Sequence, residues 1–97
     1  MPRRLHSPGD APSSAGRFLL YSRVDCHLCE QMLEDLAALP MASAYPVDVV
    51  DVDADPEARL RYGHKVPVLM FADEMVCHGR LDADEVHKTL AHHRRPV

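Results

Sequence analysis

The Cys-x-x-Cys pair of Cys26 and Cys29 constrains this chain more than any other feature, because it stands where two structural patterns meet. Before it, residues 18–21 form a short apolar run, which predicts a strand buried on both faces. After it, apolar residues recur at helical spacing and predict a helix with one buried face, formed by Leu28, Met32, Leu36 and Leu39. Pro40 is expected to end this helix. Cys26 is therefore expected at the start of a helix that directly follows a buried strand.

This position favours thiol chemistry. Unpaired N–H groups and the dipole at a helix N-terminus stabilise the thiolate, which is the reactive form of cysteine. Cα atoms at this helical spacing are about 5 to 5.5 Å apart, so Cys26 and Cys29 can form a disulfide with little backbone movement. Arg23 and His27 favour the Cys26 thiolate, whereas the carboxylate of Asp25 opposes it. The pair thus has the geometry for reversible disulfide exchange.

The middle of the chain continues this alternation of strands and helices. Further strands are expected over residues 45–52, 66–71 and 75–77, the last two joined by a turn at 72–74. Between them, Asp55 followed by Pro56 predicts the start of a short helix, which Gly63 is expected to end in a left-handed turn.

A last helix completes the pattern. Asp82 and Glu85 have the spacing of a capping box at its start. Its inward stripe is expected to consist of Ala83, Val86 and Leu90, with Arg94 and Arg95 at the negative C-terminal end. The order β-α-β-α-β-β-α predicts an α/β fold with a mixed four-stranded sheet flanked by helices.

The composition describes one small soluble domain. The chain has 97 residues, of which 46% are apolar and 27% charged. Residues 1–16 are rich in proline, glycine and serine, so we expect a disordered tail there and a folded domain over residues 17–97. Three cysteines are too few for a disulfide-rich secreted scaffold, which favours the cytoplasm.

Charge and hydropathy argue against two classes of partner. The 11 basic and 15 acidic residues give a formal net charge of −4, whereas a nucleic-acid-binding domain needs a basic excess. No apolar run approaches the ~18 to 20 residues that span a bilayer. The basic residues near the N-terminus are not followed by the apolar segment of a secretory signal. We therefore expect no nucleic acid and no membrane as partner.

Three segments together resemble the thioredoxin and glutaredoxin superfamily, and in particular the bacterial glutaredoxin-like proteins with a C-x-L-C site. They are residues 21–30 (YSRVDCHLCE), 51–53 (DVD) and 62–69 (YGHKVPVL). The resemblance implies a thioredoxin fold and a thiol–disulfide oxidoreductase that acts on protein disulfides. Separately, we expect a monomer. In that family the first cysteine, here Cys26, attacks the substrate, and the second, here Cys29, resolves the mixed disulfide.

The resemblance also implies a substrate-binding surface and no resident cofactor. Pro67 matches the family's cis-proline, which faces the cysteines and leaves the backbone of Val66 for an extended substrate. His27 and Leu28 fill the space between the cysteines, where typical glutaredoxins have Pro-Tyr, and Gly79 is retained from their glutathione-binding stretch. Arg23 matches a basic glutathione contact and Lys65 offers another, so glutathione is open as a co-substrate. The chain has no tryptophan and hence no thioredoxin Trp-Cys-Gly-Pro-Cys signature.

Two other functions stay open. A non-catalytic thioredoxin-fold module would use the groove around Val66 and Pro67 to bind a protein. A metal or iron–sulfur site would need further ligands beside the two cysteines, and the adjacent Cys77 and His78 project to opposite faces of a strand. Cys77 is expected to be a buried or half-buried strand residue without a catalytic role. Of the histidines, His64 is expected near the mouth of the site.

Overall fold

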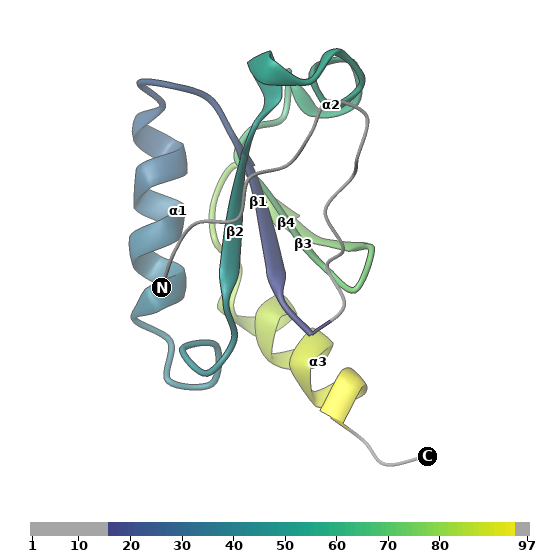
Figure 1. The fold of residues 1–97 in the computed structure, drawn as a ribbon. Helices are drawn as coiled ribbons and strands as arrows, with labels where there is room; N and C mark the ends of the chain where they lie inside the picture. Colours follow the sequence, from purple (N-terminus) through teal and green to yellow (C-terminus); the bar gives the residue numbers. More distant parts are fainter. Residues whose placement is uncertain (1–15, 95–97) are drawn as a thin grey trace.

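The computed structural model describes residues 16–94 (Figure 1). Its elements follow the expected order: β1 (Phe18–Ser22), α1 (His27–Ala37), β2 (Val47–Asp51), a 3₁₀ turn η1 (Val52–Ala54), α2 (Pro56–Tyr62), β3 (Val68–Phe71), β4 (Glu74–His78) and α3 (Ala83–Arg94). The expected tail lies outside the described residues except for Gly16, as does Arg95. Within residues 16–94, no helix is long and apolar enough to cross a membrane.

The four strands form one mixed sheet in the order β2-β1-β3-β4. β1 runs parallel to β2 and antiparallel to β3, and β3 runs antiparallel to β4. A β-α-β crossover therefore supplies the parallel pair and a hairpin supplies the other two strands, which confirms the predicted thioredoxin fold. The carboxyl ends of β1 and β2 point to the same end of the sheet, so α1 and α2 both begin there, at the top of Figure 1.

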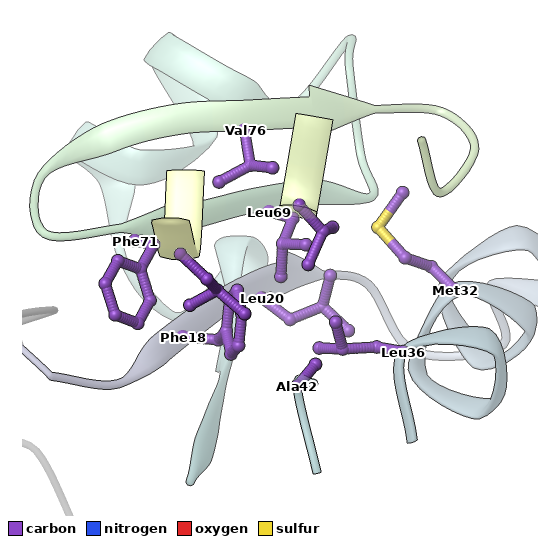
Figure 2. Packing of buried hydrophobic residues seen from close by; sticks show 10 residues of the cluster. Phe18, Leu20, Met32, Leu36, Ala42, Leu69, Phe71 and Val76 are labelled. Atoms are coloured by element: carbon purple, nitrogen blue, oxygen red, sulfur yellow. The ribbon is translucent and has the colours of Figure 1, made fainter. Parts of the chain in front are cut away.

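The hydrophobic core lies between the sheet and the two longer helices (Figure 2). Phe18 and Leu20 are two positions apart on β1 and so share one face of the sheet, where they meet Leu69 and Phe71 of β3. The other buried members of this cluster are Met32 and Leu36 of α1, Ala42 after it, Val76 of β4, and Val86 and Leu90 of α3. Burial of these faces orients α1 against the sheet and thereby places its first turn.

The buried face of α1 begins one residue later than predicted, at Cys29. Leu28 was expected to point inward, but it is 50% exposed, whereas Cys29 is only 4% exposed. The inward residues Cys29, Met32 and Leu36 follow the spacing i, i+3, i+7, and Leu28 lies about 100° away from Cys29 around the helix. The helix also ends at Ala37, before the predicted stop. The second cysteine thus takes the place in the core that the pattern gave to a leucine.

The second strand, the third strand and the end of α2 also differ from the predictions. The second strand ends at Asp51 because the carboxylate of that residue accepts the N–H of Asp53 (2.9 Å) and starts a 3₁₀ turn. The third strand begins at Val68, two residues later than expected. Gly63 does end α2, but with φ −55° instead of a left-handed conformation. A Cβ at Gly63 would meet the carbonyl oxygen of Arg59 at 2.5 Å, so glycine is needed there for a close approach.

The hairpin and the last helix are close to the predictions. Ala72 and Asp73 have φ of 50° and 66°, which are the φ signs of the two-residue turns that match the twist of a hairpin. The carboxylate of Asp82 accepts the N–H of Glu85 at 3.2 Å, as expected for the cap of α3. Val86 and Leu90 are buried, whereas Ala83, which was expected inside, is exposed because it is the first helical residue and lies beyond the edge of the core.

Candidate active site

Cys26 and Cys29 form a disulfide at the start of α1. Their Cα atoms are 5.2 Å apart, as the helical spacing predicted. Cys26 is the N-cap of α1, and its Sγ accepts the backbone N–H of Cys29 at 3.1 Å. Cys26 is half-buried, whereas Cys29 belongs to the core. The two sulfurs are therefore inequivalent: one faces the helix amides near the surface, and the other lies behind it.

The loop that delivers Cys26 has an unusual backbone conformation. Asp25, directly before the N-cap, has a left-handed φ of 60°, which non-glycine residues rarely adopt but aspartate tolerates better than most. The carboxylate is exposed, and so is Val24 beside it, at 71%. This turn lets the chain leave β1 and enter α1 with Cys26 in the extended conformation of an N-cap.

Arg23 fixes the start of this loop to two other elements. Its guanidinium donates to both carboxylate oxygens of Asp53 in η1, at 2.8 and 3.2 Å, and to the carbonyl oxygen of Gly63 at 3.3 Å. Bidentate arginine–carboxylate pairs define geometry better than a single contact does. The structure thus uses Arg23 to hold the end of β1, η1 and the end of α2 together, and its charge is already partnered by Asp53.

A surface depression of about 420 Å³ adjoins Arg23. It is lined by Arg23, Pro56, Arg59, Leu60, Gly63 and His64. Because neither cysteine belongs to this lining, the expected position of His64 at the mouth of the site stays a prediction. Arg59 and Leu60 were not singled out from the sequence. The sequence indicated only where the short helix α2 begins, at Asp55 and Pro56. It did not indicate which part of the molecule the side chains of α2 face.

The peptide bond between Val66 and Pro67 is cis, as the resemblance implied. These residues directly precede the pair of Tyr21 with Val68 in the β1–β3 register, so they lie beside the end of β1 that leads to Cys26. The N–H of Gly79 donates to the carbonyl oxygen of Pro67 at 2.8 Å. The fold therefore brings three of the expected substrate-binding residues to the same end of the sheet as the disulfide.

The remaining expected contacts are exposed around this end. His27 and Leu28 are the first two residues of α1, and both side chains face solvent. Lys65 is exposed in the connection from α2 to β3, and its backbone N–H donates to the carbonyl oxygen of Tyr62 at 2.8 Å. All of these side chains are exposed to solvent.

The sequence did not predict the ion pair of Asp53 with Arg23. In the same segment, Asp55 was expected to cap the start of α2. The cap is present, because Asp55 accepts the N–H of Glu57 at 3.1 Å. Asp53, however, lies after the strand and binds Arg23, which is 30 positions away in the sequence. No local pattern reports a pairing of that separation.

Cys77 lies in β4, half-buried against the core, as predicted. Burial raises the pKa of its thiol above the ordinary value of 9.0, and a hydrogen bond with the backbone of Asp82 acts in the opposite direction. A thiol held in its neutral form is a poor nucleophile. Within residues 16–94, no group of three or more histidine, cysteine or acidic side chains is placed to hold a metal ion.

Comparisons with known proteins agree with this geometry. The family model described as "Glutaredoxin-like domain (DUF836)" matches residues 17–91. The solution NMR structure of protein Ne2328 from Nitrosomonas europaea is similar, with 29% identity, a TM-score of 0.69, and coverage of 87% of this chain and 98% of that chain. The X-ray structure of target protein XcR50 from X. campestris has 34% identity, a TM-score of 0.63, and coverage of 81% and 99%. None of the curated proteins matches.

Proposed function

Because this chain belongs to the glutaredoxin-like domain family (DUF836), we propose that it is a thiol–disulfide oxidoreductase that uses the Cys26–Cys29 pair. The observation that carries the proposal is the disulfide itself, formed between an N-cap cysteine and a cysteine in the first turn of α1. A disulfide stabilises a fold more when it closes a longer loop, and this one closes only a helical turn, with a sequence separation of 3. Its position suits exchange with a substrate.

The different environments of the two sulfurs support different roles. Cys26 is the attacking group, because its sulfur lies at the helix N-terminus, where the N–H of Cys29 and the helix dipole stabilise a thiolate. Cys29 is 4% exposed, so a substrate disulfide cannot reach it first. It is the resolving thiol, which acts only after Cys26 has bound the substrate.

The cycle transfers two electrons from the protein to the substrate. The Cys26 thiolate attacks one sulfur of the substrate disulfide, the S–S bond breaks, and the other substrate sulfur leaves as a thiolate. Cys29 then loses its proton and attacks the Cys26 sulfur of the mixed disulfide, which releases the second substrate thiolate. The protein is left with the Cys26–Cys29 disulfide, and an external dithiol or pair of thiols must reduce it for the next turnover.

The surroundings of the disulfide supply the proposed substrate site. His27 and Leu28 flank the sulfurs, and the segment from Lys65 to Pro67 and Gly79 lie at the same end of the sheet. We propose disulfide-containing proteins as substrates and the cytoplasm as the compartment. A glutathione carboxylate at Arg23 would have to share a guanidinium that Asp53 already occupies.

Two single variants test the proposal. Reduced protein is mixed with hydroxyethyl disulfide or insulin, and thiol release is followed in the parent, in Cys26→Ser and in Cys29→Ser. We expect the parent to react and Cys26→Ser to be inactive. Cys29→Ser should accumulate a mixed disulfide at Cys26 that mass spectrometry detects. Absence of any reduction by the parent would contradict an enzymatic role and would favour the non-catalytic binding module.

A further inference from the structure

The most exposed large apolar side chains of residues 16–94 lie in the loop before α1, in α1 and in α2, and both helices begin at the same end of the sheet (Figure 1). Leu60 is 84% exposed, Val24 71% and Leu28 50%, and these are the three highest values. Val24 and Leu28 flank Cys26 in the sequence, and Leu60 lines the depression beside Arg23. A single exposed apolar side chain is ordinary, but three at this end of a small domain are the apolar rim expected of a binding surface.

The same end carries positive charge that no ion pair neutralises. The acids at the start of α2 are engaged: Asp53 binds Arg23, Asp55 caps the helix, and Glu57 pairs with Arg61 at 3.4 Å. By contrast, Arg59 and Lys65 form no ion pair within the described part of the chain. Arg59 and Lys65 are therefore open to a carboxylate, although the exposed Asp25 and Glu30 beside the cysteines add negative charge at the same end.

From these two features we propose that the substrate is a protein segment with a carboxylate and a large apolar side chain close to its disulfide cysteine. This inference rests on the proposed function. The unpaired guanidinium of Arg59 binds the carboxylate at the depression, and Leu60, Leu28 and Val24 contact the apolar side chain. The apolar rim separates this class from glutathione, which brings carboxylates but no large apolar group.

Mixed disulfides with 2-nitro-5-thiobenzoate make suitable probes, because release of that thiolate is coloured. The Cys26 thiolate attacks the sulfur of the probe cysteine and the nitrothiobenzoate leaves; Cys29 then releases the probe as a thiol, and the protein is oxidised. The probes are end-blocked Glu-Leu-Cys-Glu, end-blocked Lys-Leu-Cys-Lys and glutathione. Hydroxyethyl disulfide, which is small and uncharged, measures the basal exchange activity.

We expect the acidic peptide to react about threefold to fivefold faster than the basic one at low salt, with the difference shrinking as salt is added. It should also react faster than the glutathione derivative. Arg59→Ala should remove most of the acidic preference. Arg61→Ala is the matched control, because that guanidinium lies on the same helix but is already paired with Glu57 and does not line the depression. Leu60→Ser should slow the acidic peptide and leave the glutathione derivative unchanged.

The outcomes separate the two proposals. If hydroxyethyl disulfide is reduced but the two peptides react equally, or Arg61→Ala matters as much as Arg59→Ala, the substrate proposal is wrong and the enzymatic one stands. A glutathione derivative that reacts faster than the acidic peptide also overturns the substrate proposal. If not even hydroxyethyl disulfide is reduced, the proposed function fails, and the substrate proposal fails with it.

Discussion

At its first residue, strand β1 packs into a group of aromatic rings, whereas beyond its last residue it enters a loop held by polar contacts. The ring centroid of Phe18 lies 4.9 Å from that of Phe71 and 6.1 Å from that of Tyr45. At the opposite end, Arg23 binds Asp53, and Cys26 caps α1. One end of the strand is dry and the other is exposed and charged.

Along a strand of only five residues, one end therefore contributes mainly to the stability of the fold and the other mainly to the reactivity of the disulfide. Buried rings contribute hydrophobic free energy that does not depend on exact polar geometry. Exposed ion pairs contribute little to stability, about 0 to 1 kcal/mol each, but they fix the positions of particular groups. Substitutions at the Phe18 end should therefore change the free energy of unfolding, and those at the Cys26 end should change reactivity.

The largest effect is expected from Phe18→Ala. Phe18 is fully buried, and its removal leaves a cavity next to Phe71, so the free energy of unfolding should fall by about 3 to 5 kcal/mol. Urea unfolding measures this loss. Among molecules that remain folded, the rate of disulfide exchange should match the parent. A reduced rate in the folded fraction would show that the two ends of β1 are coupled.

A smaller loss is expected from Gly63→Ala, at the polar end. The new Cβ would meet the carbonyl oxygen of Arg59 at 2.5 Å and the guanidinium of Arg23 at 3.4 Å, which costs about 1 to 3 kcal/mol of unfolding free energy. Gly79→Ala is a useful control, because Gly79 has a left-handed φ of 78° and no neighbouring atom within 4 Å of an added Cβ. It should cost about 1 kcal/mol, from backbone strain alone. An equal loss in both variants would argue against the close approach at Gly63.

These two ends also differ in how far the sequence predicted them. The aromatic end follows from local patterns, because an apolar run and alternating positions are enough to place Phe18 and Phe71 inside. The position of Cys26 was predictable for the same reason, since a strand followed by an amphipathic helix fixes where the helix begins.

The polar end was predicted less completely. The expected inner face of α1 included Leu28 in place of Cys29, because helical periodicity alone does not distinguish adjacent apolar residues at the edge of a face. The pairing of Arg23 with Asp53 joins positions far apart in sequence and depends on the tertiary fold. The cis bond at Pro67 was anticipated only through the family resemblance, since a proline at the start of a strand is compatible with trans.

Alkaline pH should weaken the fold through Tyr21, at the same end of β1. Burial raises the pKa of Tyr21 above the ordinary value of 10.0, and the neighbouring Tyr62, whose ring lies 4.5 Å away, and Asp55 add to the rise. The folded state therefore holds this proton more tightly than the unfolded state. Its contribution to stability is complete below about pH 10 and is lost as the pH rises through the folded pKa.

Tyr21→Phe keeps the ring and removes this titration. Its urea midpoint should fall less than that of the parent between about pH 9 and pH 11. Cys77 also has a raised pKa, because of burial, so the comparison is made in Cys77→Ala proteins to remove its share. Equal losses with and without the Tyr21 hydroxyl would contradict the assignment.

The smallest effect on stability, and a clear effect on reactivity, is expected from Asp25→Asn. Asparagine tolerates the left-handed φ of 60° at this position, so the free energy of unfolding should change by less than about 0.5 kcal/mol. Loss of the carboxylate next to Cys26 removes a repulsion that opposes the thiolate, and the alkylation rate of Cys26 in the reduced protein should rise about twofold to fivefold near neutral pH. Mass spectrometry identifies the modified cysteine, and Asp84→Asn, an exposed acid in the first turn of α3, controls for the change in net charge. An unchanged rate would mean that the exposed carboxylate is screened by solvent, and the helix amides alone would then set the reactivity of this end of the sheet.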